Sequence, residues 1–183
     1  MNSALLKPLD AVWLMMESDD TPMQMGVLAI FKKPGSAPDS YLADLAEGMR
    51  AVPPVAPWNC RVSRRLGYRL VPGKDFDIDY HFRRSALPGP GGERELGQMI
   101  SRLHSNALDP HRPLWEVHLI EGLERNRFAL YIKVHHALVG GVNAVPPVLA
   151  TLSTRARARD AQPLWASPIV NADVQDDLTD TLQ

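Results

Sequence analysis

Two adjacent histidines, His135 and His136, are the residues of this sequence best suited to proton chemistry. They stand near the end of FALYIKVHHALVGG, residues 128–141, which closes with Gly140 and Gly141. A neutral imidazole titrates near pH 7, so it can take a proton from a hydroxyl group and give one to a leaving group. The same pattern also suits a metal site, or a histidine that only bonds to backbone at the end of a strand.

Metal binding is the weakest of these three interpretations. Side chains of successive strand residues point to opposite faces, so the two histidines cannot easily share one ion while strand geometry persists. The remaining histidines show no ligand spacing, and we expect no metal. No serine or cysteine stands in a recognisable nucleophile elbow, and Cys60 lies in a proline-rich loop. For an enzyme, direct transfer assisted by a base is favoured over a covalent intermediate.

Composition and charge narrow the class of protein. The 183 residues suit one domain, with 45% hydrophobic and 22% charged residues. A net charge of −1 gives no reason to expect nucleic-acid binding, and the single cysteine suits a reducing compartment. No stretch has the pattern of a signal peptide, and the apolar runs are too short to span a bilayer. We expect a soluble, cytoplasmic protein.

Helices and strands must alternate to position the histidines. The patterns predict helices over residues 8–17, 38–49, 93–107 and 148–152, and strands over residues 25–32, 76–82, 115–121 and 127–134. In the second strand, aspartates and His81 are expected to form a wet face. In the last strand, Tyr131 and Lys133 share a face with His135 and are expected to meet solvent. The fold class is α+β, a mixed sheet with packed helices.

The chain changes character after residue 152. Arginines alternate with alanines, and the last residues are acidic without a strong period. We expect a domain over residues 1–152 and a linker or loosely docked tail over residues 153–183.

Three stretches in order resemble the bacterial wax ester synthase/diacylglycerol acyltransferase family. PLDAVWLMMESDDTPMQMGVLAIF is similar to the family's first helix and strand, and DFDIDYHFRRSALPGPGGERELGQMISRLHSNALD to its middle segment. RPLWEVHLIEGLERNRFALYIKVHHALVGG resembles its proline-leucine-tryptophan motif followed by the histidine motif. The match covers residues 9–152, and the spacing of the three stretches makes it specific.

The resemblance implies a fold related to chloramphenicol acetyltransferase and to peptide-synthetase condensation domains. It implies transfer of an acyl group from fatty acyl-CoA, as a substrate and without a cofactor, to a long-chain alcohol or diacylglycerol. His136 would be the general base, with His135 as its supporting neighbour. Pro113, Leu114 and Trp115 would shape the substrate tunnel, although Trp115 also suits a core anchor at the start of a strand. Contact with the inner membrane or lipid inclusions is also implied.

The sequence departs from the family pattern in two ways. The family motif is His-His, three residues, Asp, Gly, whereas this sequence has Gly140 and Gly141 at the last two places. The family aspartate is thought to hold the shape of the loop, so its loss should loosen the support of the base. Family members also have a second, C-terminal domain, which we expect to be a separate chain or missing. The alternative is therefore a catalytically impaired fragment or relative that binds acyl chains or a partner domain.

Four arginines, Arg61, Arg64, Arg65 and Arg69, have two interpretations. They can attract the phosphates of CoA, or they can form a solvated basic loop. The second interpretation is favoured because no phosphate-cradling backbone motif accompanies them. An acyltransferase of the same superfamily that acts on another hydroxyl or amine is a further, weaker hypothesis.

Overall fold

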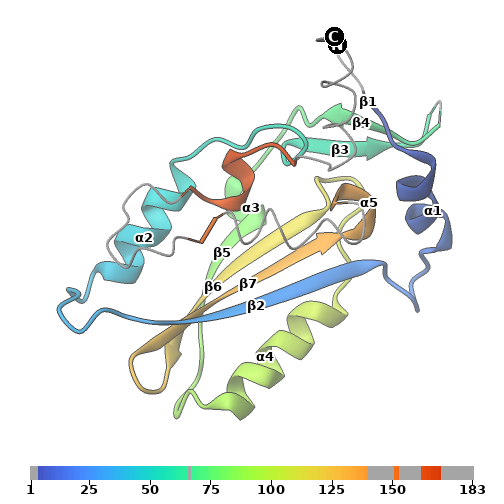
Figure 1. The fold of residues 1–183 in the computed structure, drawn as a ribbon. Coiled ribbons are helices and arrows are strands. Elements are labelled where there is room, and N and C mark those ends of the chain that lie inside the picture. The colour runs from blue at the N-terminus through green and yellow to red at the C-terminus, as the bar shows by residue number, and fades with distance from the viewer. Residues whose placement is uncertain (1–3, 66, 140–150, 153–161, 170–183) are drawn as a thin grey trace, which may run out of the picture.

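The computed structural model describes residues 4–65, 67–139, 151–152 and 162–169. A four-stranded mixed sheet lies at the centre of the fold, with a three-stranded antiparallel sheet beside it (Figure 1). The predicted α+β class, a mixed sheet with packed helices, is therefore confirmed. Within the described ranges, no helix is long and apolar enough to cross a membrane.

The larger sheet encloses the strand that carries the histidines. Its order is β2 (Gln24–Lys32), β7 (Arg127–His135), β6 (Trp115–Leu123) and β5 (Phe82–Ala86). Strand β7 is antiparallel to both β2 and β6, whereas β5 is parallel to β6. The strands predicted over 25–32, 115–121 and 127–134 are confirmed. Because β7 is a central strand, neighbours on both sides hold its last residue.

The alternation along β7 gives the sheet two different faces. On one face, α2 (Tyr41–Arg50) packs over an apolar core that includes Phe128, Ile132 and Val134 of β7. On the other face, Ala129 and Tyr131 pack against α4 (Glu93–Ser105). The helix contributes its apolar stripe, formed by Leu96, Met99, Ile100 and Leu103. The helices predicted from Pro38 and from Glu93 are confirmed.

Two glycines let the loop before α4 pass close to the β6–β7 hairpin. Gly91 and Gly122 have φ values of 75° and 83°, in the left-handed region that other residues rarely adopt. A Cβ atom on Gly91 would overlap the carbonyl oxygen of Gly122. The Gly91 carbonyl accepts a hydrogen bond from the Glu124 N–H at 2.9 Å. In the LPGPGG stretch, Gly91 is thus needed for close backbone packing against Gly122.

Helix α1 (Pro8–Met16) packs beside the short helix α5 (His136–Val139) (Figure 1). Leu14 of α1 and Ala137 of α5 share a small core with Leu114, which precedes β6. The smaller sheet lies nearby, in the order β1 (Ala4–Leu5), β4 (Arg69–Pro72) and β3 (Cys60–Ser63). The predicted helix over residues 8–17 is confirmed, and it lies next to the histidine motif.

The strand predicted over residues 76–82 is wrong in its first part. Residues Ile78–His81 form a short helix, α3, and the strand β5 begins only at Phe82. The cause is a local cap, because the Asp77 carboxylate accepts the Asp79 N–H at 3.0 Å and turns the backbone. His81 was expected on a wet face, but it is completely buried.

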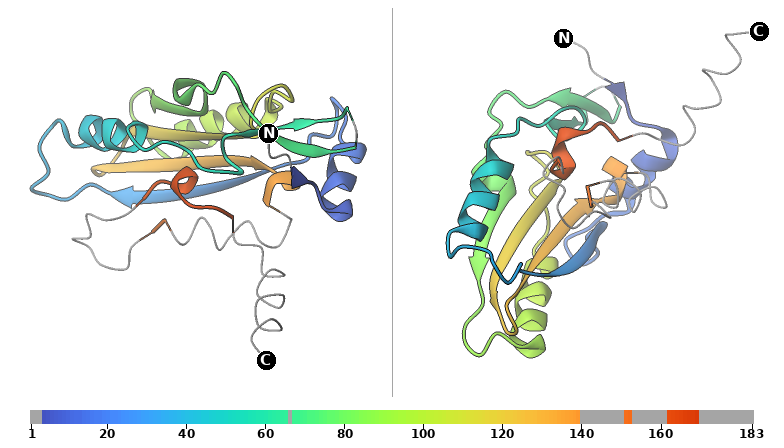
Figure 2. Two further views of the ribbon diagram at one scale, coloured as in Figure 1. Left: turned by 90° about the horizontal axis from the view of Figure 1, so that it is seen from above. Right: turned by 60° about the vertical axis from the view of Figure 1, so that its left-hand side comes forward.

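The segment after residue 161 packs into the core. A short 3-10 helix, η2 (Leu164–Ala166), lies on the face of the sheet opposite α4 (Figure 2). Trp165 is completely buried and stacks on Trp115, with ring centroids 5.3 Å apart. Its indole N–H donates to the Val52 carbonyl at 2.9 Å. The expected linker or loosely docked tail over 153–183 is therefore wrong for this stretch, while the domain boundary at 152 stays a prediction.

Candidate active site

The two histidines lie at the junction between a strand and a helix. His135 is the last residue of β7, and His136 is the first residue of α5. The His135 amide donates to the Leu114 carbonyl at 3.0 Å, and the His136 amide donates to the Met23 carbonyl at 3.0 Å. Backbone hydrogen bonds to the segments before β6 and before β2 therefore fix this junction. A side chain on such a junction is held more rigidly than a side chain on a free loop.

The side chain of His136 packs against α1. Its ring stacks on the indole of Trp13, with centroids 4.5 Å apart and an interplanar angle of 21°. The side chain is partly exposed, whereas Nδ1 is buried and has no hydrogen-bond partner among the described residues. Burial lowers the pKa of His136. The ring is therefore neutral at pH 7 and has the capacity to accept a proton.

His135 has a different environment, since its side chain is only 1% exposed. Its Nε2 lies 3.2 Å from Glu17 Oε1, within ion-pair distance but outside hydrogen-bond geometry. Its Nδ1 accepts the Ala137 N–H at 3.0 Å. Burial lowers the pKa of His135, and the Glu17 carboxylate opposes that change. A ring with both nitrogens so engaged suits a supporting role.

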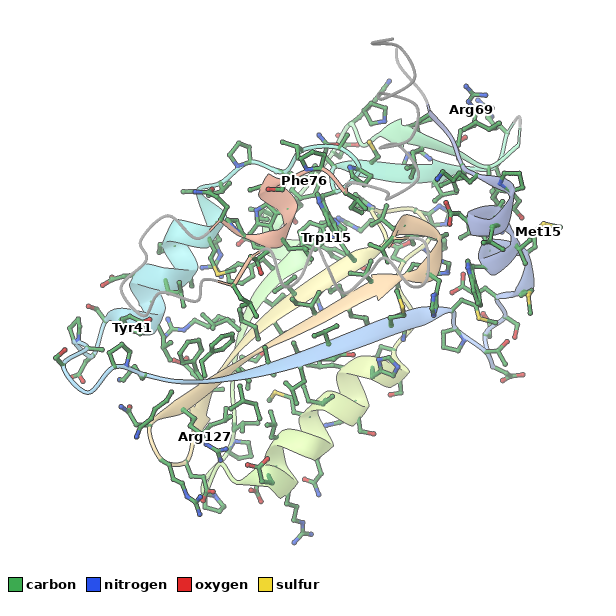
Figure 3. All side chains as sticks on the ribbon, in the orientation of Figure 1. Met15, Tyr41, Arg69, Phe76, Trp115 and Arg127 are labelled. Carbon is green, nitrogen blue, oxygen red and sulfur yellow. The ribbon has the colours of Figure 1, made fainter. Side chains whose placement is uncertain are left out.

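The residues before β6 take three different positions. Pro113 is buried and lines a surface cleft, and Leu114 is packed between α1 and α5. Trp115 is completely buried in the main core near Phe76 (Figure 3), and its indole N–H donates to the Trp58 carbonyl at 2.7 Å. Trp115 therefore anchors the core, and Pro113 is the member of this trio that lines the cleft.

Gly140 and Gly141, the predicted loop support, lie outside the described residues, as does most of the predicted helix over 148–152. Within the described ranges, no group of three or more histidine, cysteine, aspartate or glutamate side chains is placed to hold a metal ion.

The prediction that Tyr131 and Lys133 meet solvent is wrong. Lys133 is 1% exposed, and its Nζ lies 3.3 Å from Oε2 of the buried Glu116. The same ammonium donates to the carbonyls of Leu103 and Asn106, both at 2.9 Å. These carbonyls lie at the C-terminal end of α4, where backbone acceptors lack helical partners and a cation is favourable.

A surface cleft of about 690 Å³ opens beside the Pro113 end of β6. Basic side chains outnumber acidic ones in its lining, which includes Arg61, Arg65, Lys74, Arg112, Asp75 and Asp109. The Arg112 guanidinium lies 4.0 Å from the centre of the Tyr80 ring, and this contact restrains it. Arg64 and Arg69 do not line the cleft, so the four arginines do not act as one group.

Sequence reasoning missed two residues whose side chains contact the histidine rings in the part of the chain that the structure describes. Trp13 and Glu17 belong to α1 and its C-terminal cap, far from the motif in sequence. The only available signal was their presence in the first stretch that resembles the family.

The fold has relatives among solved structures. The structure is similar to the first condensation domain of the calcium-dependent antibiotic synthetase, with a TM-score of 0.58 and 19% identity. This match covers 82% of the chain and 36% of that protein, and it concerns the fold alone. The fold is thus the predicted type, shared by condensation domains and chloramphenicol acetyltransferase.

The wax ester synthase/diacylglycerol acyltransferase catalytic domain model matches residues 6–182, so the chain belongs to this family. The solved wax ester synthase/diacylglycerol acyltransferase of Marinobacter aquaeolei superimposes with a TM-score of 0.84 and 42% identity, over 97% of the chain and 45% of that protein. The O-acyltransferase WSD of Acinetobacter baylyi is 40% identical over 162 residues, 87% of the chain and 35% of the relative.

A Mycobacterium tuberculosis protein with a provisional diacylglycerol O-acyltransferase name is 48% identical over 154 residues, 81% of the chain. The chain spans only about a third of the curated relatives, 31% of this protein and 35% of the Acinetobacter one.

Proposed function

We propose that the chain forms the histidine-bearing domain of an O-acyltransferase that transfers a fatty acyl group from acyl-CoA to a long-chain alcohol or a diacylglycerol. Membership of the family supports the reaction class. The observation that carries the proposal is the environment of His136, whose neutral and partly exposed imidazole is held at the start of α5, directly after the central strand β7. A second domain, as a separate chain or as a further part of the protein, would complete the substrate tunnel.

In the proposed reaction, His136 acts as the base. One ring nitrogen takes the proton of the acceptor hydroxyl as its oxygen attacks the thioester carbonyl carbon. The carbon–sulfur bond of the tetrahedral intermediate then breaks, and the imidazolium returns the proton to the departing CoA thiolate. The ester forms, the histidine regains its neutral state, and no cofactor is required.

The basic cleft is a candidate site for the phosphates of the acyl donor. Pro113 lies between the cleft and the histidine junction. It lines the cleft, and the carbonyl of the next residue, Leu114, accepts a hydrogen bond from the His135 N–H. Arginine and lysine bind phosphate oxygens through charge-assisted hydrogen bonds. Replacing Arg61 by glutamate should raise the KM for acyl-CoA more strongly than it lowers kcat. An equal replacement of Arg125, which is exposed and outside the cleft lining, is the matched control.

Contact with a membrane surface or lipid inclusion is part of the same proposal. Helix α1 exposes large apolar side chains: Leu9 is 72%, Met15 69% and Met16 57% exposed. The outward position of Met15 can be seen in Figure 3. Apolar side chains in this arrangement suit contact with acyl chains beside the histidine junction.

The experiment compares wild type with His136→Ala, each as the 183-residue chain and each mixed with the remaining part of the Marinobacter relative. Acyl transfer from fatty acyl-CoA to hexadecanol and to a diacylglycerol is measured. We expect activity in the wild-type mixture and a loss of at least about 100-fold in His136→Ala, which is the scale of general-base catalysis. An unchanged rate in a folded His136→Ala would exclude His136 as the base.

The second candidate function is binding of acyl chains or a partner domain without catalysis. Gly140 motivates it, because the family pattern has aspartate at this place. Gly140→Asp in the same mixture distinguishes the two functions. Activity that appears or rises in this variant favours an impaired enzyme, whereas no activity in either form, with acyl-CoA binding retained, favours the binding function.

A further inference from the structure

Glu17 joins the end of α1 to the end of β7. Its own amide donates to the Trp13 carbonyl at 3.1 Å, so it caps α1. Its Oε1 accepts the Met23 N–H at 3.2 Å and lies 3.2 Å from Nε2 of His135. The carboxylate is 23% exposed, whereas the imidazole that it faces is 1% exposed. The negative charge of Glu17 is thus held beside Nε2 of the buried His135 ring.

The other nitrogen of His135 defines the tautomer. Nδ1 accepts the Ala137 N–H at 3.0 Å, and a nitrogen that accepts a hydrogen bond carries no proton. The proton of the neutral ring is therefore on Nε2, the nitrogen that faces Glu17. The Glu17 carboxylate stabilises this tautomer, because it places negative charge beside the N–H group.

The same bond supports the helix that starts at His136. Ala137 lies in the first turn of α5, where amides lack carbonyl partners within the helix. His135 Nδ1 satisfies one of these amides and so acts like an N-cap. If the ring changed tautomer, an N–H group would face the Ala137 N–H, and the first turn would have to move.

We propose that Glu17 is a positioning residue: it holds His135 in the Nε2–H tautomer, and His135 in turn fixes the first turn of α5 and the direction of His136. Glu17 and Trp13 are joined by a backbone bond, so the end of α1 supports both rings, one by charge and one by stacking. The consequence for catalysis depends on the proposed function, whereas the positioning itself does not.

The charges around His135 predict the effect of removing the carboxylate. Burial lowers the pKa of His135, Glu17 raises it, and His136 and Arg64 lower it further. In Glu17→Gln, the side chain keeps an oxygen for the Met23 amide but loses the charge, so the pKa of His135 should fall further. In Glu17→Ala, the oxygen is lost as well, so the bond from the Ala137 amide is left to oppose the second tautomer without the help of a charge at Nε2.

The test is imidazole nitrogen NMR of the 183-residue chain. We expect wild-type His135 as the Nε2–H tautomer, Glu17→Gln with the same tautomer and a lower pKa, and Glu17→Ala with a mixture of tautomers and faster exchange of the Ala137 amide. Asp20→Ala is the matched control, because Asp20 is an exposed acid in the turn that follows Glu17. An unchanged tautomer and unchanged Ala137 exchange in a folded Glu17→Ala would overturn the proposal. If that variant fails to fold, an unchanged His135 pKa in Glu17→Gln overturns it.

The acyl-transfer assay adds a readout that a general loss of stability would not give. In Glu17→Gln, kcat should fall about 10-fold with the KM for acyl-CoA unchanged, which is the scale for residues that orient an active group. A changed His135 pKa with an unchanged kcat would refute the positioning of the base. If His136→Ala leaves activity intact, the proposed function fails, and the NMR result alone then decides the role of Glu17.

Discussion

Replacing Lys133 by methionine should lower the free energy of unfolding by about 3 kcal/mol, near the lower end of the range for removing one partner of a buried ion pair. Methionine keeps much of the side-chain volume but removes the donors to Leu103 and Asn106. It also removes the ammonium 3.3 Å from Glu116, whose side chain is 9% exposed. The carboxylate therefore stays buried with less compensation.

The expected loss of stability follows from the hydrogen bonds that are removed and from the charged groups that remain near Glu116. Two charge-assisted bonds to carbonyls contribute about 1.5–3 kcal/mol each. Desolvation opposes this gain, since burial lowers the pKa of Lys133 despite the neighbouring Glu116. After the replacement, His118 Nε2 remains 3.4 Å from the carboxylate and Arg83 Nη2 remains 3.8 Å away. These two neighbours moderate the loss.

The assay is urea unfolding of the wild type, Lys133→Met, Glu116→Gln and the double variant, followed by tryptophan fluorescence. Neutralising Glu116 removes the uncompensated charge, so the double variant should be more stable than the sum of the single effects predicts. We expect a coupling energy of about 1–3 kcal/mol between the two side chains. Additivity within about 0.5 kcal/mol would refute the view that the two charges form one buried unit.

Two further predictions concern the core. Trp165→Ala should lower the free energy of unfolding, measured in urea, by about 3–5 kcal/mol, because a completely buried indole and its hydrogen bond to the Val52 carbonyl are lost. A loss below about 1 kcal/mol would show that η2 is not docked on the core. Burial lowers the pKa of His81 below its ordinary value of 6.5, so below about pH 6.5 the unfolded chain binds a proton that the folded chain does not. Stability should therefore fall on acidification, by up to about 1.4 kcal/mol per pH unit for this group. Urea midpoints between pH 5 and 7.5 measure it: His81→Phe should flatten the curve, and identical slopes would contradict this assignment.

The central strands and the main helices were predictable because a period of two or of 3.6 residues reflects which side is buried. The wrong predictions depend on local side-chain caps or on contacts with distant segments, and the periodicity of the sequence gives no information about either. Residues 76–82 alternate like a strand, yet the Asp77 side chain caps a turn of helix there. Alternation placed Lys133 and His135 on one face, but what covers that face depends on the end of α4, whose carbonyls need donors.

The candidate site was predicted in part for the same reason. The doublet identified His135 and His136, and the strand period placed them at the end of β7. The directions of their side chains depend on the helix that starts at His136. They also depend on Trp13 and Glu17, which precede β2 and lie more than a hundred residues before the histidines in the sequence. A buried Trp165 was not predictable, because its partners Phe82 and Trp115 belong to distant segments.

The pairing of β2 with β7 has a consequence for folding kinetics. The β6–β7 hairpin needs only a short turn, whereas Gln24 must meet His135 across most of the described chain. Closing a long loop has a larger entropic cost than closing a hairpin, so we expect β2 to dock late. The Met23–His136 bond and the Glu17–His135 contact form only with that docking. The geometry of the histidine junction is thus among the last parts of the domain to assemble, and transient release of β2 would disrupt it while the hairpin stays folded.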